Sequence, residues 1–144
     1  MSTTQSSDPN ERVEHPRWYN GHPSGIECIE IIEHLPCNLA NAVKYIWRYG
    51  LKQSSDQIRD LRSADWYVRR EISRIDRFDL EDEPKPRADP VWRKLAARIV
   101  HVQGDQDGLL ADCLYALLQD DLPGLLNRVE REVANLREKG CAAL

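Results

Sequence analysis

The chain has 144 residues, of which 41% are hydrophobic and 31% are charged, and its formal net charge is −4. This length fits one domain, or one domain with an appended helical module, and no apolar run approaches the roughly 20 residues of a membrane-spanning helix. Residues 1–15 lack the apolar stretch of a secretion signal, and the cysteines lack metal-binding spacing. We therefore expect a soluble cytoplasmic protein with reduced thiols.

The charge is unevenly distributed along the chain. Residues 38–77 carry nine Lys/Arg against five Asp/Glu, whereas the segments before and after them are each net −4. This positive charge is too small for a face that binds duplex nucleic acid, but it suits a small phosphate-bearing ligand. We expect a small anion as the partner and no duplex nucleic acid.

The spacing of apolar residues predicts an all-α fold, because helical periodicity recurs and no stretch alternates with period two for long. Residues 1–18 lack any period and are expected to form a flexible arm. A three-helix core is expected within residues 19–77, from helices over 26–35, 38–50 and 55–76. A proline-rich linker at 78–90 precedes a C-terminal helical module at 91–140, with helices over 91–103, 108–119 and 123–139.

Several helix ends carry recognisable signals. Asn38 is a good N-cap for the second helix, and Gly50 can take the left-handed conformation that often closes one. Asp89 followed by Pro90 predicts the start of the fourth helix, and Gly140 predicts the end of the last.

The second helix carries a polar stripe. Asn41, Lys44, Tyr45 and Arg48 lie at i, i+3, i+4 and i+7, and Lys52 follows one turn later. Apolar residues occupy the other side of this helix: Leu39, Ala42, Val43, Ile46 and Trp47. The stripe therefore predicts a phosphate site, although a basic solvent-facing surface is the alternative, with a small repulsion between Lys44 and Arg48.

His22 and Glu27 lie on either side of a turn that precedes the first helix. An imidazole and a carboxylate that converge on one ligand can move a proton. The alternative is that Glu27 complements the helix dipole and His22 is an exposed loop residue. On the first helix, Ile26 and Ile29 are expected to face the core.

Glu27, Glu30 and Glu33 repeat every three residues on the first helix. All-α nucleoside triphosphate pyrophosphohydrolases hold magnesium with such carboxylate pairs, so this activity is a second hypothesis. The second pair of that family is incomplete here, and a solvated acidic face is the alternative interpretation.

The third helix and the leucine-rich helix each carry a line of residues at helical spacing. On the third helix the line consists of Asp60, Ala64, Tyr67 and Glu71. On the leucine-rich helix, an apolar stripe within 109–118 predicts core or an oligomer interface. No P-loop sequence occurs in the chain, so a P-loop kinase fold is excluded.

One pattern unites these positions across three expected helices: His22, Gly25, Ile26, Glu27, Asn38, Asn41, Lys44, Arg48, Gly50, Lys52, Asp60, Trp66, Tyr67 and Glu71. It resembles a small phage-encoded family whose members are described as nucleotide kinases or as a phage domain of unknown function. The characterised coliphage member phosphorylates deoxynucleoside monophosphates without a P-loop. The resemblance covers about residues 19–76, departs from the family at Ala40, and leaves residues 88–140 as an extension.

The resemblance implies a nucleotide site and a deoxynucleoside monophosphate kinase in the cytoplasm of an infected bacterial host. Side-chain chemistry assigns proton handling or orientation to His22 and Glu27. The positions that the resemblance implies for nucleotide and phosphate binding are Asn38, Asn41, Lys44, Arg48, Lys52, Asp60 and Tyr67. A nucleoside triphosphate would donate the phosphate, no residue is assigned to a metal, and a magnesium requirement stays open.

A third hypothesis is not enzymatic. The chain would sequester a nucleotide or cyclic nucleotide and so help a phage evade host signalling. Because a short three-helix core is marginal alone, we also expect a homo-oligomer with sites at subunit boundaries.

Overall fold

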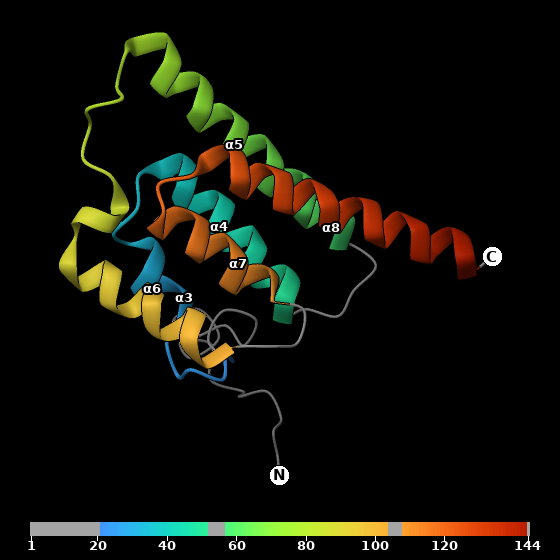
Figure 1. The fold of residues 1–144 in the computed structure, drawn as a ribbon. Helices are drawn as coiled ribbons and strands as arrows, with labels where there is room; N and C mark the ends of the chain where they lie inside the picture. The colour runs from blue at the N-terminus through green and yellow to red at the C-terminus, as the bar shows by residue number, and fades with distance from the viewer. Residues whose placement is uncertain (1–20, 52–56, 104–107, 144) are drawn as a thin grey trace, which may run out of the picture.

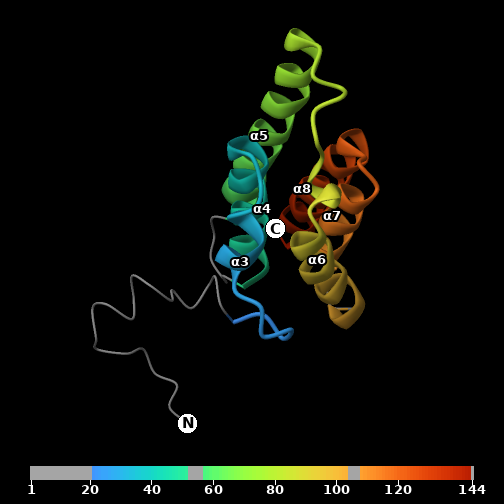
Figure 2. The ribbon, with the colours of Figure 1, turned by 90° about the vertical axis from the view of Figure 1, so that its left-hand side faces the viewer.

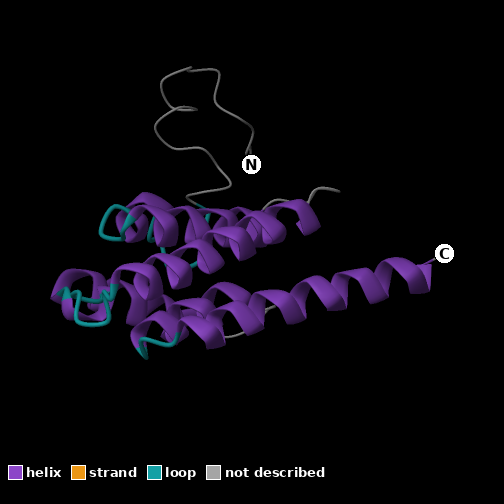
Figure 3. Ribbon diagram, turned by 90° about the horizontal axis from the view of Figure 1, so that it is seen from above, coloured by secondary structure: helices purple, strands orange, loops and turns teal. Residues whose placement is uncertain are grey.

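The computed structural model describes residues 21–51, 57–103 and 108–143, and within these ranges the chain forms helices, one short 3-10 helix and loops, with no strand (Figures 1 and 3). The fold is all-α, as the periodicity predicted. Its elements are α3 (Cys28–Ile32), α4 (Cys37–Leu51), α5 (Gln57–Phe78), η1 (Pro86–Ala88), α6 (Pro90–Gln103), α7 (Leu109–Leu118) and α8 (Leu122–Ala143).

The helices form two layers. Figure 2 shows α3, α4 and α5 on one side and α6, α7 and α8 on the other. Within the first layer α4 and α5 are antiparallel, because Asn38 near the start of α4 contacts Glu71 late in α5, whereas Arg48 late in α4 contacts Asp60 early in α5. Between the layers, α5 packs on α8 and α4 packs on α7.

One hydrophobic cluster joins the two layers. The apolar face of α4 that the sequence predicted is buried, with Trp47 at its centre, and it shares this cluster with Trp92 of α6 and Leu114 of α7. Each fully buried side chain of this size contributes about 1.5–3 kcal/mol relative to exposure. Helices that precede the segment 78–90 and helices that follow it therefore share one core. The domain boundaries expected from the sequence remain predictions.

The apolar stripe expected on the leucine-rich helix belongs to this core. Leu109, Cys113, Leu114 and Leu117 of α7 are buried. Of the two predicted alternatives, hydrophobic core and oligomer interface, the structure confirms the core for these residues. Burial raises the pKa of the Cys113 thiol to about 12, and it does the same for Cys28 on α3.

Some helix ends differ from the prediction. α4 begins at Cys37, so Asn38 is inside the helix and not its N-cap, and the Ala40 amide bonds the Pro36 carbonyl instead. Gly50 is helical, and α8 continues through Gly140 to Ala143. A helical glycine costs only about 1 kcal/mol relative to alanine, so neither glycine has to end its helix.

The start of α6 is as predicted. The Asp89 carboxylate accepts hydrogen bonds from the backbone amides of Val91 and Trp92, and Pro90 is the first helical residue. His34, just after α3, lies 2.9 Å from the same carboxylate through Nδ1. This contact joins the end of the segment 78–90 to the first layer.

The first helix is shorter than expected, and its buried side is different. α3 spans only Cys28–Ile32, because the chain turns before Pro36, which disfavours a helical residue in front of it. Ile26 is buried as predicted, but Ile29 is 53% exposed and Ile31 is fully buried in its place. The expectation that Ile29 faces the core is wrong, because so short a helix lets the turns at its ends set its rotation.

Two further expectations concern membranes and the N-terminal arm. Among the residues that the structure describes, no helix has both the length and the apolar character needed to cross a bilayer. The expected arm at 1–18 and the site residue Lys52 lie outside the described residues.

Candidate functional site

The polar stripe of α4 lies beside α5. We call its residues and their partners on α5 the α4–α5 face: Asn38, Asn41, Lys44, Tyr45, Arg48, Asp60, Tyr67 and Glu71. Contacts across the two helices pair Asn38 with Glu71, Tyr45 with Tyr67, and Arg48 with Asp60. Most of the predicted ligand-binding positions are therefore brought together in space, although they come from two helices separated by residues 52–56.

The pair of Arg48 and Asp60 is the most unusual contact of this face. Arg48 Nε lies 3.7 Å from Asp60 Oδ2, so the two groups attract each other but are too far apart for a hydrogen bond. The Asp60 side chain is only 7% exposed and that of Arg48 is 31% exposed. Both facing atoms are buried and make no hydrogen bond to any described residue.

A buried charge without hydrogen bonds is costly, because the Coulomb attraction of the pair must offset the loss of hydration of both groups. Functional sites are one place where proteins keep such arrangements. The carboxylate of Asp60 can accept a hydrogen bond from a hydroxyl or amine, while the guanidinium of Arg48 can donate to phosphate oxygens.

Two aromatic rings belong to the same face as this pair. The rings of Tyr45 and Tyr67 are nearly parallel, with centroids 6.2 Å apart and an interplanar angle of 14°. Lys44 Nζ is 5.0 Å from the centroid of the Tyr45 ring. The Lys44 ammonium group therefore lies over an electron-rich ring on the partly exposed side of α4. At this position it can act as a second anion-binding group beside Arg48.

The two asparagines make different contacts. Asn38 donates from Nδ2 to Glu71 Oε1 at 3.1 Å, so its amide is used inside the protein. Asn41 donates from Nδ2 to the Cys37 carbonyl oxygen at 3.0 Å, which is a contact within α4. Of the two, Asn41 lies beside the ligand-binding candidates Lys44 and Tyr45 on the helix.

Glu71 organises one end of this face. Arg74 donates from Nε and Nη2 to its two carboxylate oxygens at 2.9 and 2.8 Å, and Arg74 also binds Glu83 at 2.7 Å. Burial alone would raise the pKa of Glu71, but the hydrogen bonds from Arg74 and Asn38 outweigh it, so the pKa lies below its usual value. The sequence placed Glu71 in a line with Asp60 and Tyr67, but gave no sign that it is buried and paired.

His22 is buried, which contradicts the interpretation of an exposed loop residue. Its ring lies 5.6 Å from that of Trp47 on α4. The Ser24 backbone amide donates to His22 Nδ1 at 3.0 Å, so this nitrogen acts as an acceptor and the ring proton of the neutral form is on Nε2. Gly25, with φ of +78°, closes the turn by donating its amide to the His22 carbonyl at 3.0 Å.

Glu27 occupies the N-cap position of α3. Its side chain accepts from the backbone of Glu30, and the Glu30 side chain accepts from the Glu27 amide at 2.7 Å. This reciprocal arrangement is a capping box, which matches the interpretation that Glu27 serves the helix end. Neither a nucleotide nor a proton transfer is needed to explain this carboxylate.

The carboxylates of α3 do not gather into a metal site. Glu27 and Glu30 bond the helix end, and Glu33 is exposed. Within the described ranges, no group of three or more His, Cys, Asp or Glu side chains is placed to hold a metal ion.

The comparisons with known proteins are limited to one family. A family model described as a protein of unknown function, DUF3310, matches residues 13–69. No curated protein matches the chain, and no solved structure does. The matched segment holds every predicted site residue from His22 to Tyr67, but it ends before Glu71 and before α6, α7 and α8.

Proposed function

We propose that the chain binds nucleotides at the α4–α5 face and transfers a phosphoryl group to a deoxynucleoside monophosphate. In this reaction the bond between the γ-phosphorus of a nucleoside triphosphate and its bridging oxygen breaks. A new bond forms to a phosphate oxygen of the monophosphate, which gives two diphosphates. The resemblance of residues 19–76 to phage-encoded nucleotide kinases supports this choice of reaction.

The observation that carries the proposal is the pair of Arg48 and Asp60. A phosphoryl group needs positive charge that is fixed before it binds, and phosphoryl transfer depends mostly on positioning and charge stabilisation. Arg48 and Lys44 supply two cations one helical turn apart, and Asp60 supplies an acceptor for a sugar hydroxyl or base amine. Lys52 would add a third cation from outside the described residues.

His22 takes an orienting role in this proposal. With Nδ1 occupied by the Ser24 amide, the neutral ring presents its Nε2 proton as a donor. Its ring packs against Trp47, the residue that precedes Arg48 in α4. A role as general base through Nδ1 would require this turn to open first.

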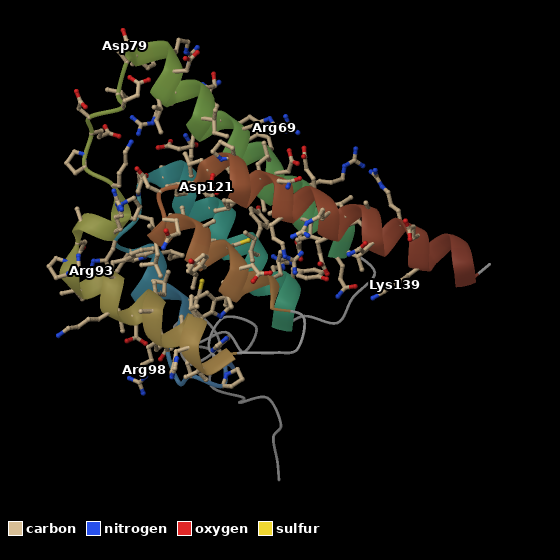
Figure 4. All side chains as sticks on the ribbon, viewed as in Figure 1. Arg69, Asp79, Arg93, Arg98, Asp121 and Lys139 are labelled. Atoms are coloured by element: carbon tan, nitrogen blue, oxygen red, sulfur yellow. The ribbon has the colours of Figure 1, made fainter. Side chains whose placement is uncertain are left out.

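The test is a calorimetric titration of the wild type with each deoxynucleoside monophosphate and with ATP. Arg48→Ala should weaken binding by about tenfold or more, because hydrogen bonds to charged groups contribute about 1.5–3 kcal/mol. Lys44→Ala should weaken it less. Arg98→Ala is the control, since Arg98 is an exposed cation on α6 (Figure 4).

A transfer assay with labelled ATP then tests the reaction itself. Formation of labelled deoxynucleoside diphosphate that depends on Arg48 supports kinase activity. Tight binding with the nucleotide recovered unchanged would instead favour the sequestering protein. Equal binding by wild type, Lys44→Ala and Arg48→Ala would overturn the assignment of the site.

The pyrophosphohydrolase hypothesis has less support from the same residues. The capping box uses both Glu27 and Glu30, so their carboxylates are directed at the end of α3. Release of pyrophosphate that stops on addition of a chelator would restore this hypothesis and count against the kinase.

We also propose that the chain forms a homo-oligomer, as the sequence led us to expect. Ile29 on α3 and Tyr115 on α7 each expose more than half of their surface, which an interface would cover. Light scattering at micromolar concentration should report a mass above that of one chain, and a monomer would contradict the proposal.

A further inference from the structure

A groove with a volume of about 420 Å³ lies along the contact between α5 and α8. Trp66 of α5 forms one wall, and Val133 and Ala134 of α8 form apolar surface opposite it. Figure 1 shows the two helices crossing, and Figure 4 shows Arg69 on α5 close to where α8 passes. We call this cavity the α5–α8 groove. None of its residues belongs to the α4–α5 face.

The groove has three arginines, which differ in how they are paired. Arg69 donates to Asp65 on its own helix at 2.6 Å and also pairs with Glu130 on α8. The hydrogen bond and charge of Asp65, with those of Glu130, raise the pKa of Arg69 further above its ordinary value. Arg69 therefore ties the two helices together and is not available to a ligand.

Arg62 and Arg137 are the other two arginines of the groove, one on each helix. Neither forms an ion pair or a side-chain hydrogen bond with any described residue. Both acidic side chains of the groove are already bound by Arg69. The groove consequently presents two unpaired guanidinium groups, on opposite walls, to whatever enters it.

Trp66 gives the groove an aromatic surface. Its side chain is 57% exposed, and its ring meets that of Tyr67 at an interplanar angle of 88°. A second hollow, lined by Ile58, Arg59 and Ser63, shares Trp66 and Arg62 with the groove. An exposed tryptophan between hollows, with arginines at both, provides a stacking surface next to cations.

We propose that the α5–α8 groove binds a nucleobase stacked on Trp66, with the attached phosphate held by Arg62 and Arg137. The volume is that of a small-molecule site, which typically has about 300–1,000 Å³. Both guanidinium groups can hold phosphate oxygens in two hydrogen bonds. A free nucleotide and one unit of a single-stranded nucleic acid both present a base with an attached phosphate. A protein partner would instead have to offer carboxylates to the two arginines.

This site is separate from the one in the proposed function. It uses α8, which lies outside the segment matched by the family, and it shares no residue with the α4–α5 face. Either site can therefore exist without the other, and variants of each distinguish them.

The experiment measures binding of dAMP, of ATP and of a short single-stranded oligothymidylate to the full chain by equilibrium dialysis. Trp66→Ala and the double variant Arg62→Ala/Arg137→Ala should each weaken binding at the groove by about 5- to 100-fold, the range expected for loss of one stacked base. Trp66→Phe keeps an aromatic ring and should retain most of the binding. Arg70→Ala on α5 and Lys139→Ala on α8 are the controls, because both cations are exposed and do not line the groove. Lys139 lies near the far end of α8 (Figure 4).

Dependence of dAMP or ATP binding on these residues supports a site for a free nucleotide, and dependence of oligothymidylate binding alone supports a site for a single strand. Because dAMP and ATP are also the ligands proposed for the α4–α5 face, the groove variants are measured in the wild-type and in the Arg48→Ala background. The groove variants should weaken the binding that remains in the Arg48→Ala background, so failure of the proposed function would not imitate failure here. The proposal is overturned if the groove variants bind all three probes as the wild type does. It is also overturned if these variants instead lower the mass of an assembly in sedimentation, because the groove would then be an interface between copies.

Discussion

The α4–α5 face and the α5–α8 groove both contain arginines and aromatic rings, but their charges are arranged in different ways. On the face, Asp60 and Glu71 are buried, and each lies against an arginine. In the groove, Arg62 and Arg137 are exposed cations without partners among the described residues. Buried pairs contribute to the folded structure as well as to a ligand, whereas exposed cations can serve a ligand at almost no cost to stability. Variants of the two regions should therefore affect stability very differently.

The largest expected effect is that of Glu71→Ala. The substitution leaves Arg74 and Asn38 without their shared acceptor, and the arginine is partly exposed, so we expect a loss of about 2–3 kcal/mol in the free energy of unfolding. Urea unfolding followed by circular dichroism measures it. Glu138→Ala, an exposed carboxylate on α8, is the control, and an equal loss in both variants would contradict the importance of the buried pair.

The pH dependence of stability should show the same pairing with a smaller effect. The pKa of Glu71 is below its usual value in the folded chain, so its contribution is complete above the unfolded pKa of about 4.3 and is lost as the pH falls through the lower folded pKa. The pKa of Glu132 is also below its usual value. Burial alone would raise this pKa, but hydrogen bonds from Tyr49 and Arg128 outweigh that effect.

Urea unfolding at pH values between about 5 and 3 tests this dependence. Glu71→Gln should be less stable than the wild type at pH 7 and should lose less stability on acidification, because a carboxylate whose pKa is lowered by folding is gone. Parallel curves for wild type and Glu71→Gln would show that Glu71 is not linked to folding.

The smallest expected effect on stability is that of Arg62→Ala/Arg137→Ala in the groove. Exposed side chains without partners usually change the free energy of unfolding by no more than about 0.5 kcal/mol each. Thermal melting should therefore place this double variant near the wild type, although its nucleotide binding is expected to fall. A large drop in melting temperature would mean that the groove arginines are structural, and the contrast with the face would disappear.

The sequence was informative wherever one helix decides the outcome. The polar and apolar sides of α4 follow from spacing within that helix, and Asp89 with Pro90 marks the start of α6 through local hydrogen bonds. It was misleading where a local signal is weak. Gly140 did not end α8, Asn38 did not cap α4, and His22 proved to be buried.

Contacts between residues of different helices could not be predicted from the spacing of residues along the chain. Glu71 stood in the predicted line on α5, but its burial depends on Asn38 and Arg74 together. The α5–α8 groove needs Trp66 and Val133, which are far apart in the chain and share no pattern. The presence of Trp66 and its neighbouring arginines in α5 does not indicate which helix will pack opposite them.

By itself, the sequence determined the all-α class of this protein, the apolar side of α4, and the stripe that carries Lys44 and Arg48. These follow from local geometry, because residues three and four positions apart must share one side of a helix. Only the tertiary structure decided that Arg48 lies against a buried Asp60, that Glu71 is paired, and that two arginines on different helices have no partner among the described residues. Such facts depend on how the two layers pack, and packing is set by the whole core and not by any one segment.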